Sequence, residues 1–435
     1  MGRELTRRNV LRLGGGALAG IGALGWSGGR GWRAAAQDRQ RIRAAGFVES
    51  QQQLQATLAA LVRYGEMHPD VEIIPEFTDF GSYTDKLATE AAGGNAPDML
   101  TTNGSLMGEY ARRGILRPLD EYVPDPIDLS DYAAPTINGN TIDGQLFGVP
   151  NDCIAPTLVY NTAVFEQAGI PVPDQFWTWD AYAQTATDLS TAMGEGFYGT
   201  EDGGGSSLAF DVFLRGRGKE FNTADRQLGF DQADLAAWYG FWQGLRESGG
   251  APPGEVQASS STDDLSRTGL ITGWAAILPQ LTDAYFGLQS LTEDVLGLHM
   301  LPNGFSEDDL PQRHFAYAGN STSISAQTEH APTVVDIIRF MHNDPEGIEI
   351  FYQGSGLVPA TSQGRQEMLA NGTPGEQRVV EYIELLLAEP GAERNPSISG
   401  LGGILLRMNE EVAFGRLSVD EAAAEFFAEA EAKLS

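Results

Sequence analysis

The sequence predicts an α/β protein made of two units, each a sheet packed against helices. Its 435 residues exceed the roughly 100 to 200 residues of a typical domain, so two well-filled cores are expected. Strand-like and helix-like segments alternate along the chain, which is typical of parallel sheets covered by helices. The alternation resumes after Pro150, so the second unit is expected to begin there.

The first unit is predicted from two successive strand and helix pairs. Residues 41–47 (RIRAAGF) read as a short strand, and residues 51–66 have leucines at helical spacing. Residues 71–77 (VEIIPEF) read as the next strand, and Ser82–Ala92 as a helix that ends at a Gly-Gly pair. Strands that alternate with helices in this way favour a parallel sheet.

The second unit is predicted from a strand at residues 156–161 (PTLVYN), followed by two helices. The helices span Thr162–Ala168 and Thr178–Leu189, and the second begins with a capping threonine. Residues 193–226 are polar and rich in glycine, and residues 247–263 contain a Pro-Pro pair and a run of serines. Both stretches are predicted to be loops.

The acidic composition argues against nucleic acid or an anionic membrane surface as a partner. The chain has 28 Lys and Arg against 59 Asp and Glu, and its formal net charge is -31. Binding to phosphates requires clustered basic side chains that neutralise them. We therefore expect no nucleic-acid partner.

Cys153 is the single cysteine, which rules out an intrachain disulfide and a metal cluster of several cysteines. The five histidines are scattered and form no HExxH pair. No metal site and no cofactor are therefore expected. Cys153 is interpreted as a buried apolar residue rather than as a nucleophile.

Residues 1–36 are predicted to be an export signal that is removed from the mature protein. Arg7 and Arg8 precede a mildly apolar run, and three alanines before Gln37 form a small-residue cleavage site. The segment TRRNVLRL resembles a twin-arginine signal. The apolar run is too short for a membrane span of about 20 residues. The mature protein is expected outside the cytoplasmic membrane, without a lipobox cysteine.

Several segments occur in an order that resembles one protein family. They are YTDKLATEAAGGNAPDMLTTNGSLMGEYARRGILRPLDEYV (Tyr83–Val123), DGQLFGVP (Asp143–Pro150), LVYNTAVFEQAGI with FWTWDAYAQTATDL, and YAGNSTSISAQTEHAPTVVDIIRFMHNDPEGIEIF with GSGLVPATS. Together they resemble the extracellular solute-binding proteins of ABC importers, in particular the carbohydrate-binding group that includes maltose-binding proteins. In GLITGWAAILPQLTDAYFG the usual tryptophan after the turn is missing, so no stacking platform for a large sugar is predicted there.

The resemblance implies a two-lobe fold of the type II periplasmic-binding-protein class, with three hinge crossings and a ligand cleft between the lobes. Lobe 1 would comprise residues 37–150 plus 317–357, and lobe 2 residues 151–316 plus 358–435. Lobe 2 includes the tail, which is rich in Ala, Glu and Leu and is predicted to be helical. The crossings are expected near residues 149–156, 301–317 and 355–362.

Polar side chains directly after predicted strands are the first candidates for ligand binding. In open α/β sheets, ligands bind beyond the carboxyl ends of the strands. Carboxylates, amides and aromatic rings at this edge suit a sugar, which offers hydroxyls and apolar faces. The candidates from this rule are Glu49, Gln51, Asp79, Phe80, Thr102, Asn103 and Ser105. The Gly-rich loop Asp202–Ser207 adds Asp202 and Ser206, because glycines let a ligand approach closely.

The family resemblance implies further ligand-binding positions. They are Asn151, Asp152, Asp283, Tyr285, Gly319 and Asn320. For several candidates, a structural role without a ligand remains an alternative. Asp79 and Asp283 can serve as helix caps or solvated acids, and Asn151 with Asp152 can simply shape a turn. Trp238 and Trp242 are predicted to lie in a core rather than in the cleft.

The function that the resemblance implies is that of a monomeric receptor without catalytic activity. It would capture a carbohydrate between the lobes, close around it and deliver it to the permease of an ABC importer. One alternative is the same fold binding a polyamine, polyol, anion or metal chelate. Another is an exported glycoside hydrolase with Asp79 and Asp152 as acid and base, although no nucleophile elbow or zinc motif is present.

Overall fold

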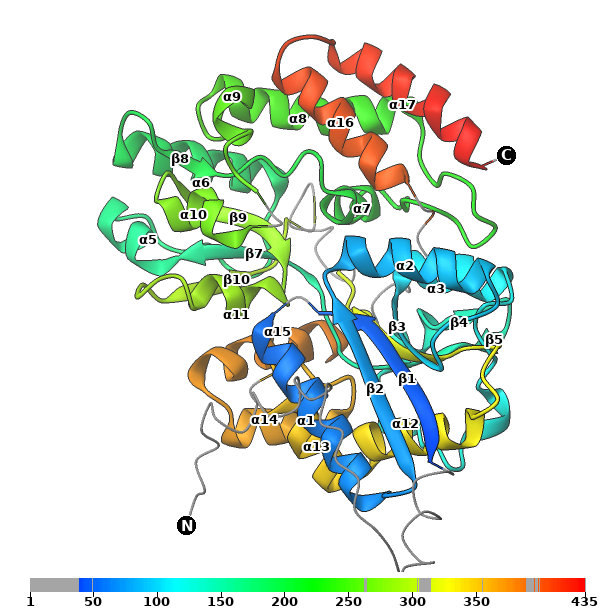
Figure 1. Cartoon of the computed structure of the whole chain (residues 1–435). Helices are drawn as coiled ribbons and strands as arrows, with labels where there is room; N and C mark the ends of the chain where they lie inside the picture. The colour runs from blue at the N-terminus through cyan, green and yellow to red at the C-terminus, as the bar shows by residue number, and fades with distance from the viewer. Residues whose placement is uncertain are drawn as a thin grey trace, which may run out of the picture. The chain divides into compact units, whose positions relative to one another are not determined.

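The computed structural model describes residues 39–48, 50–261, 264–302, 304, 314–353, 355–388, 395, 398 and 400–434, apart from the side chain of Ser105. The predicted signal segment, residues 1–36, lies outside this range. The described elements form two larger sheets with helices on both faces of each, together with one two-stranded ribbon (Figure 1). The prediction of a two-lobe α/β fold is confirmed.

The strands are short, as is typical of α/β proteins. Their bounds are β1 (Gln40–Phe47), β2 (Val71–Thr78), β3 (Met99–Asn103), β4 (Thr141–Ile142), β5 (Gln145–Leu146), β6 (Gly148–Pro150), β7 (Pro156–Asn161), β8 (Tyr198–Thr200), β9 (Ala275–Leu281), β10 (Leu296–His299) and β11 (Asn320–Ile324).

The helices include several that begin with a capping side chain, such as α1 and α6. Their bounds are α1 (Gln51–Met67), α2 (Phe80–Ala92), α3 (Gly104–Arg112), α4 (Ala134–Asn138), α5 (Thr162–Ala168), α6 (Trp179–Met193), α7 (Ser207–Arg215), α8 (Gln232–Glu247), α9 (Gly254–Gln257), α10 (Gly269–Thr272), α11 (Ala284–Gln289), α12 (Ala331–Asn343), α13 (Pro345–Tyr352), α14 (Ser362–Asn371), α15 (Pro374–Ala388), α16 (Leu401–Ala413) and α17 (Val419–Leu434), with 3-10 turns η2 (Asp120–Tyr122) and η3 (Leu265–Arg267).

The first sheet has the strand order β2-β1-β3-β11-β6. Strand β1 runs parallel to β2 and β3, whereas β11 runs antiparallel to β3 and β6. Side chains of β1 alternate between two cores. Ile42 and Ala44 join the core of α1 and α12, and Ala45 and Phe47 join the core of α2 and α3. This period of two buries both faces of the sheet.

The second sheet has the strand order β10-β7-β9-β8. On central strand β7, Leu158 joins the core of α6, α7, α8, α16 and α17, and Val159 joins the core of α11, α14 and α15. Trp238 and Trp242 of α8 are almost completely buried in the first of these cores. The prediction that both tryptophans belong to a core is confirmed.

Three segments that connect elements of the two sheets lie side by side. The backbone N–H of Cys153 donates to the Val358 carbonyl at 2.8 Å, and Ile154 and Tyr317 exchange two backbone hydrogen bonds of 2.9 Å each. Cys153 is fully buried, and burial raises the pKa of its thiol to about 12, in agreement with its interpretation as an apolar residue. The lobe boundaries stay a prediction, because residues 40–435 cluster as one unit.

The loop predictions for residues 193–226 and 247–263 were wrong over parts of both stretches. The first contains β8 and α7, and the second contains the one-turn helix α9. Helix α7 is buried along most of its length, including Asp211 and Arg215, which pair at 3.2 Å. A helix that is buried on every side has no polar stripe, so its helical period could not be recognised among the surrounding glycines.

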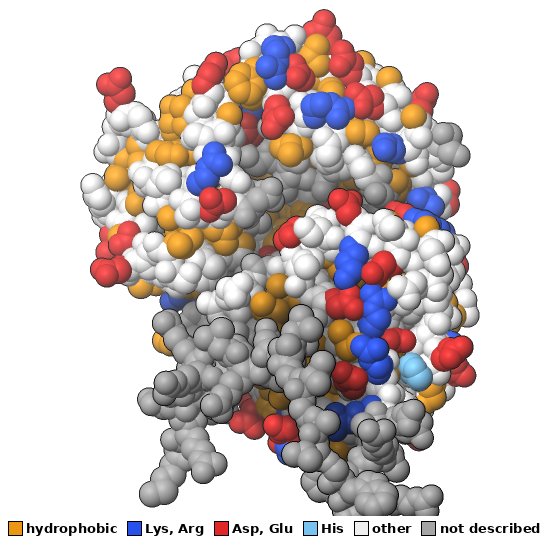
Figure 2. All heavy atoms as spheres, in the orientation of Figure 1, with side chains coloured by type: hydrophobic (Ala, Val, Ile, Leu, Met, Phe, Trp, Pro, Cys, Tyr) orange, Lys and Arg blue, Asp and Glu red, His pale blue; other side chains and the backbone are white. Residues whose placement is uncertain are grey.

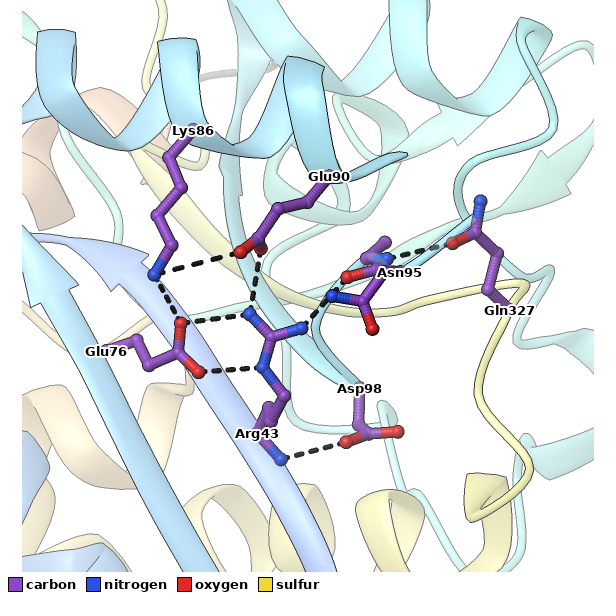
Figure 3. Close-up of polar contacts among 8 residues, drawn as sticks. Arg43, Glu76, Lys86, Glu90, Asn95, Asp98 and Gln327 are labelled. Atoms are coloured by element: carbon purple, nitrogen blue, oxygen red, sulfur yellow. Dashed lines mark hydrogen bonds and ion pairs between the residues drawn. The ribbon is translucent and has the colours of Figure 1, made fainter. Parts of the chain in front are cut away.

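A cluster of charged side chains links β1, β2 and α2 in the first sheet (Figure 3). Arg43 donates to the Glu76 carboxylate at 2.7 and 3.0 Å and to Glu90 at 2.8 Å, and Lys86 donates to Glu76 at 2.5 Å. The hydrogen bond from Arg43 is the main reason that the pKa of Glu76 is lowered to about 2. Figure 2 shows basic and acidic side chains intermingled on this face, so the charges there neutralise one another.

Candidate functional site

A pocket of about 520 Å³ lies at one edge of the second sheet. Strands β8 and β9 are parallel, and β10 has the same direction because both β9 and β10 are antiparallel to β7. Their carboxyl ends therefore meet at one edge, where β7 begins. The pocket wall is made by the loop after β8, the ends of β7 and β9, Leu301 after β10, and residues of α9 and α16. This position agrees with the rule that ligands bind beyond the carboxyl ends of strands.

Glu201 is the first residue after β8, and its side chain is buried in the pocket wall. One carboxylate oxygen accepts hydrogen bonds from the Ser260 hydroxyl at 2.5 Å and the Gln257 amide at 3.5 Å, and the other accepts from the Leu270 backbone N–H at 3.1 Å. Burial raises the pKa of Glu201, and these hydrogen bonds partly oppose the rise. Both carboxylate oxygens are thus already used to hold the wall together.

Asp202 forms a buried ion pair with Arg246 of α8. The Asp202 carboxylate also accepts from the Gly204 backbone N–H at 2.8 Å and from the Asn409 side-chain amide at 3.3 Å. Its own backbone N–H donates to Gln257 at 2.9 Å. Because the charges of Asp202 and Arg246 neutralise each other, the main role of this pair is structural: it holds the loop and Asn409 in place.

One stripe of helix α16 forms another part of the pocket wall. It consists of Leu406, Asn409, Glu410, Ala413 and the following residue Phe414, which are spaced three and four residues apart. Leu406 is 49% exposed and Phe414 is 37% exposed, although both are large apolar side chains. Exposed apolar side chains on a pocket wall can contact the apolar faces of a ligand.

The glycines of the loop after β8 are required by close packing. A Cβ atom at Gly204 would lie 2.3 Å from the Asn409 side-chain oxygen, and one at Gly205 would lie 2.4 Å from Leu406. A Cβ atom at Gly203 would lie 2.8 Å from the Trp242 ring. The glycines therefore let α16 and α8 approach the backbone, and they place the loop so that Gly203 and Gly205 line the pocket.

Among the residues predicted from sequence, the structure brings Asp202 and Ser206 together in this pocket. Ser206 also caps α7 by accepting a hydrogen bond from the Ala209 backbone N–H at 3.2 Å. The other predicted residues do not line it.

The candidates near β1, β2 and β3 lie in the first sheet. Glu49 is outside the described residues, as is the side chain of Ser105, whose backbone belongs to α3. Gln51 is exposed at the start of α1. Asp79 caps α2 by accepting from the Ser82 backbone N–H at 2.9 Å, which lowers its pKa. Phe80 packs edge-on against Phe47 with a centroid distance of 4.9 Å.

Thr102, Asn103 and Tyr285 are used by the fold itself. Thr102 is fully buried, with its hydroxyl 2.8 Å from that of Ser323, and Asn103 accepts from the Leu106 backbone N–H at 3.2 Å. Tyr285 is fully buried, and its hydroxyl donates to the Leu296 carbonyl at 3.1 Å. None of these three residues lines the pocket.

The candidates Asn151, Asp152, Gly319 and Asn320 meet where the sheets are connected. Asp152 accepts from the Asn320 backbone N–H at 2.8 Å, and Asn151 accepts from the Thr322 hydroxyl at 2.8 Å. Burial raises the pKa of Asp152 to about 7, with a smaller contribution from Asp283, and its second carboxylate oxygen has no partner among the described residues. A Cβ atom at Gly319 would lie 2.9 Å from Asp152. Asp283 caps α11.

Most of the pocket wall was not predicted from the sequence. The missed polar residues include Glu201, Gln257, Ser260, Asn409 and Glu410. Glu201 could have been found by the strand-end rule, because it directly follows β8. Asn409 and Glu410 lie on a helix of the tail, and the sequence contains no signal that brings this helix to the sheet.

The described part of the chain has no helix that is long and apolar enough to cross a membrane. Within the same residues, no group of three or more His, Cys, Asp or Glu side chains is arranged to hold a metal ion. Glu201 and Asp202 of the pocket are instead occupied by hydrogen bonds and by Arg246.

Comparison with known proteins identifies the family. Residues 59–367 match the bacterial extracellular solute-binding proteins, which covers more than half of the chain. The chain belongs to this family. A lactose-binding protein of Rhizobium radiobacter is 30% identical over 144 residues, covering 31% of this chain and 32% of that protein. An arabinooligosaccharide-binding protein of Halalkalibacterium halodurans is 24% identical over 141 residues, covering 31% of each chain. This solute-binding protein thus matches about a third of the length of its curated relatives.

Solved structures show the same fold. An extracellular solute-binding protein of family 1 from Alicyclobacillus acidocaldarius superimposes with a TM-score of 0.71 and 23% identity, covering 92% of this chain and 99% of that one. An oligogalacturonide-binding protein from Yersinia enterocolitica superimposes with a TM-score of 0.78 and 19% identity, covering 91% and 98%. These likenesses establish the fold of this solute-binding protein.

Proposed function

We propose that this protein captures a carbohydrate in the pocket beside the second sheet and delivers it to the permease of an ABC importer. The observation that carries the proposal is the composition of the pocket wall. The wall combines the polar side chains Ser206, Gln257 and Glu410 with the exposed apolar side chains Leu406 and Phe414. A sugar needs both, because it presents hydroxyls and apolar C–H faces. The names of several relatives also support a sugar.

In the proposed mechanism, the ligand favours closure of the two lobes about the three connecting segments. A ligand must favour the closed form by about 5.5 kcal/mol to shift a two-state population from 1:99 to 99:1. Several hydrogen bonds at about 1 kcal/mol each, together with one apolar contact, supply a free energy of this size. The permease would bind the closed form.

The test is the binding of neutral sugars to the purified protein. Lactose, maltotriose and an arabino-oligosaccharide should be titrated by calorimetry and compared by thermal unfolding. A bound sugar at 100 times its Kd should stabilise the protein by about 2.7 kcal/mol and raise its Tm. If no carbohydrate in a broad panel raises the Tm, the proposal of a sugar ligand is wrong.

A cationic solute is the second candidate, because three acids and no Lys, Arg or His occur among the described residues of the pocket wall. A polyamine would pair with Glu410, the exposed acid of this wall, while Glu201 and Asp202 keep their bonds within the protein. Competition between spermidine and maltotriose separates the candidates. If spermidine binds and displaces maltotriose, the ligand class is a polyamine.

We further propose that the mature protein is an exported monomer that does not alter its ligand. Asp79 is an exposed helix cap, and Asp152 is buried and bound to Asn320, so neither has the surroundings of a glycosidase acid and base. Fusion of residues 1–36 to a folded reporter should direct export, and Arg7→Lys with Arg8→Lys should block it. Prolonged incubation with a bound sugar should release no product.

A further inference from the structure

We propose that the pocket selects its ligand by charge, and that Glu410 is the residue that does so. The preferred ligand would be a donor-rich sugar that is neutral or carries an amino group, whereas a sugar with a carboxylate would be rejected. This inference rests on the proposed function and adds the chemical class of the sugar.

The three acids of the pocket differ in how far the protein compensates their charges. Asp202 is neutralised by Arg246, and Glu201 accepts hydrogen bonds on both carboxylate oxygens. Glu410 is exposed on α16, and its carboxylate has no hydrogen bond or ion pair with any described residue. Its charge is therefore the one least compensated by the protein, and a ligand in the pocket meets it directly.

Asn409 is the neighbour of Glu410 in the pocket wall. Its side-chain nitrogen donates to Asp202 at 3.3 Å, and its side-chain oxygen is buried without a partner among the described residues. A buried and unpaired oxygen favours a ligand that donates a hydrogen bond to it. Asn409 is only 5% exposed, so bulk solvent does not replace that donor.

These two side chains determine which polar groups of a ligand the pocket accepts. Asn409 and Glu410 both offer acceptor oxygens, so a hydroxyl or an ammonium group can donate to them. A carboxylate would face acceptors and a negative charge, and no cation lines the pocket among the described residues to pair with it. Charge, rather than shape alone, therefore excludes a uronate.

The experiment compares matched sugars that differ in one group. Galactose, galactosamine and galacturonate form this matched set. Lactose, the disaccharide of glucosamine and digalacturonate extend the comparison to a larger site, although they also differ in their sugar units and linkage. Calorimetry at neutral pH and low salt should give the amino sugar an affinity about tenfold above that of the neutral sugar, and no measurable binding of the uronate. Raising the salt concentration should reduce the tenfold preference, because salt screens exposed charges.

Variants assign the effect to Glu410. Glu410→Gln should remove the preference for the amino sugar, so that the amino sugar and the neutral sugar bind with similar affinities, and Glu410→Lys should allow the uronate to bind. Glu411→Gln is the matched control, because it removes the same charge from the adjacent residue, which pairs with Arg416 at 2.6 Å and does not line the pocket. This control should retain the wild-type order of affinities.

The outcomes separate the two proposals. If the uronate binds as well as the neutral sugar, or if Glu410→Gln leaves the order unchanged, charge selection by Glu410 is wrong while the sugar-binding function stands. If neither these sugars nor any carbohydrate of the broad panel binds to the wild-type protein or to Glu410→Lys, the carbohydrate function itself is wrong, and the inference fails with it.

Discussion

Polar residues follow strands in both sheets, but those of the first sheet and those of the second have different surroundings. Asp79 directly after β2 and Asn103 at the end of β3 accept hydrogen bonds from the backbone at the start of α2 and α3. After β8, Glu201 and Asp202 line a pocket of about 520 Å³. The same local pattern thus produces helix caps in one sheet and a pocket wall in the other.

The difference arises from helix α16, which packs against the loop after β8. The side-chain amide of Asn409 donates a hydrogen bond to Asp202. A Cβ atom at Gly205 would lie 2.4 Å from Leu406, so the helix packs closely against the loop. In the first sheet, a Cβ atom at Gly104, directly after β3, would meet nothing within 4 Å. A strand end becomes part of a pocket when a second element closes over it, so strand-end polarity alone does not locate a site.

The largest effect is expected from Asp202→Ala, which leaves Arg246 as a buried and unpaired charge. Removal of one partner of a buried ion pair costs about 3–5 kcal/mol. Urea denaturation should show this loss in the free energy of unfolding. Asp79→Ala in the first sheet removes only an exposed cap and should cost much less. Equal losses for the two variants would contradict the comparison.

Asp152 follows β6 of the first sheet and is a buried acid, but unlike Asp202 it forms no ion pair with a described residue. It therefore tests how burial alone affects the stability of the fold. Its pKa is about 7, against 3.8 for an unperturbed Asp, so between these values the folded state binds a proton that the unfolded state does not. The stability that Asp152 contributes should therefore fall as the pH rises from about 4 to about 7. Asp152→Asn should remove up to about 1.4 kcal/mol per pH unit from this slope, measured by denaturation across the range. An unchanged slope would show that Asp152 is ionised throughout.

Gly204→Ala tests the contact between the loop and α16. The new Cβ atom would lie 2.3 Å from Asn409, and overpacking of this kind costs about 1–3 kcal/mol. Thermal unfolding should show the loss, and sugar affinity should fall with it. Gly104→Ala is the control, and it should be neutral or stabilising by up to about 1 kcal/mol. A neutral Gly204→Ala would mean that α16 does not close tightly over the loop.

Phe414→Ala should have the smallest effect on stability, because this side chain is 37% exposed in the pocket wall. The free energy of unfolding should change by about 0.5 kcal/mol or less. Sugar affinity should fall about tenfold, which corresponds to about 1.4 kcal/mol, because an apolar contact with the ligand is lost. Phe176→Ala, at a 47% exposed position outside the pocket, should leave affinity unchanged. Equal affinities for the two variants would exclude Phe414 from the site.

The local elements could be predicted from the sequence wherever they are amphipathic. The strands at residues 41–47 and 71–77, and the helix at residues 51–66, agree closely with β1, β2 and α1. The order of family motifs also identified the two-lobe fold and the solute-binding family, which the match over residues 59–367 establishes. Helix α7 was missed because it is buried on every side.

The alternation of strands and helices, the family and the loop with Asp202 and Ser206 follow from local patterns in the amino-acid sequence. That this loop becomes a pocket wall depends on tertiary packing, because Asn409 and Glu410 approach it from a helix about 200 residues further along the chain. No local pattern encodes such an approach. It follows from the packing of α16 with α17 and α8, and from glycines whose missing side chains leave room for it.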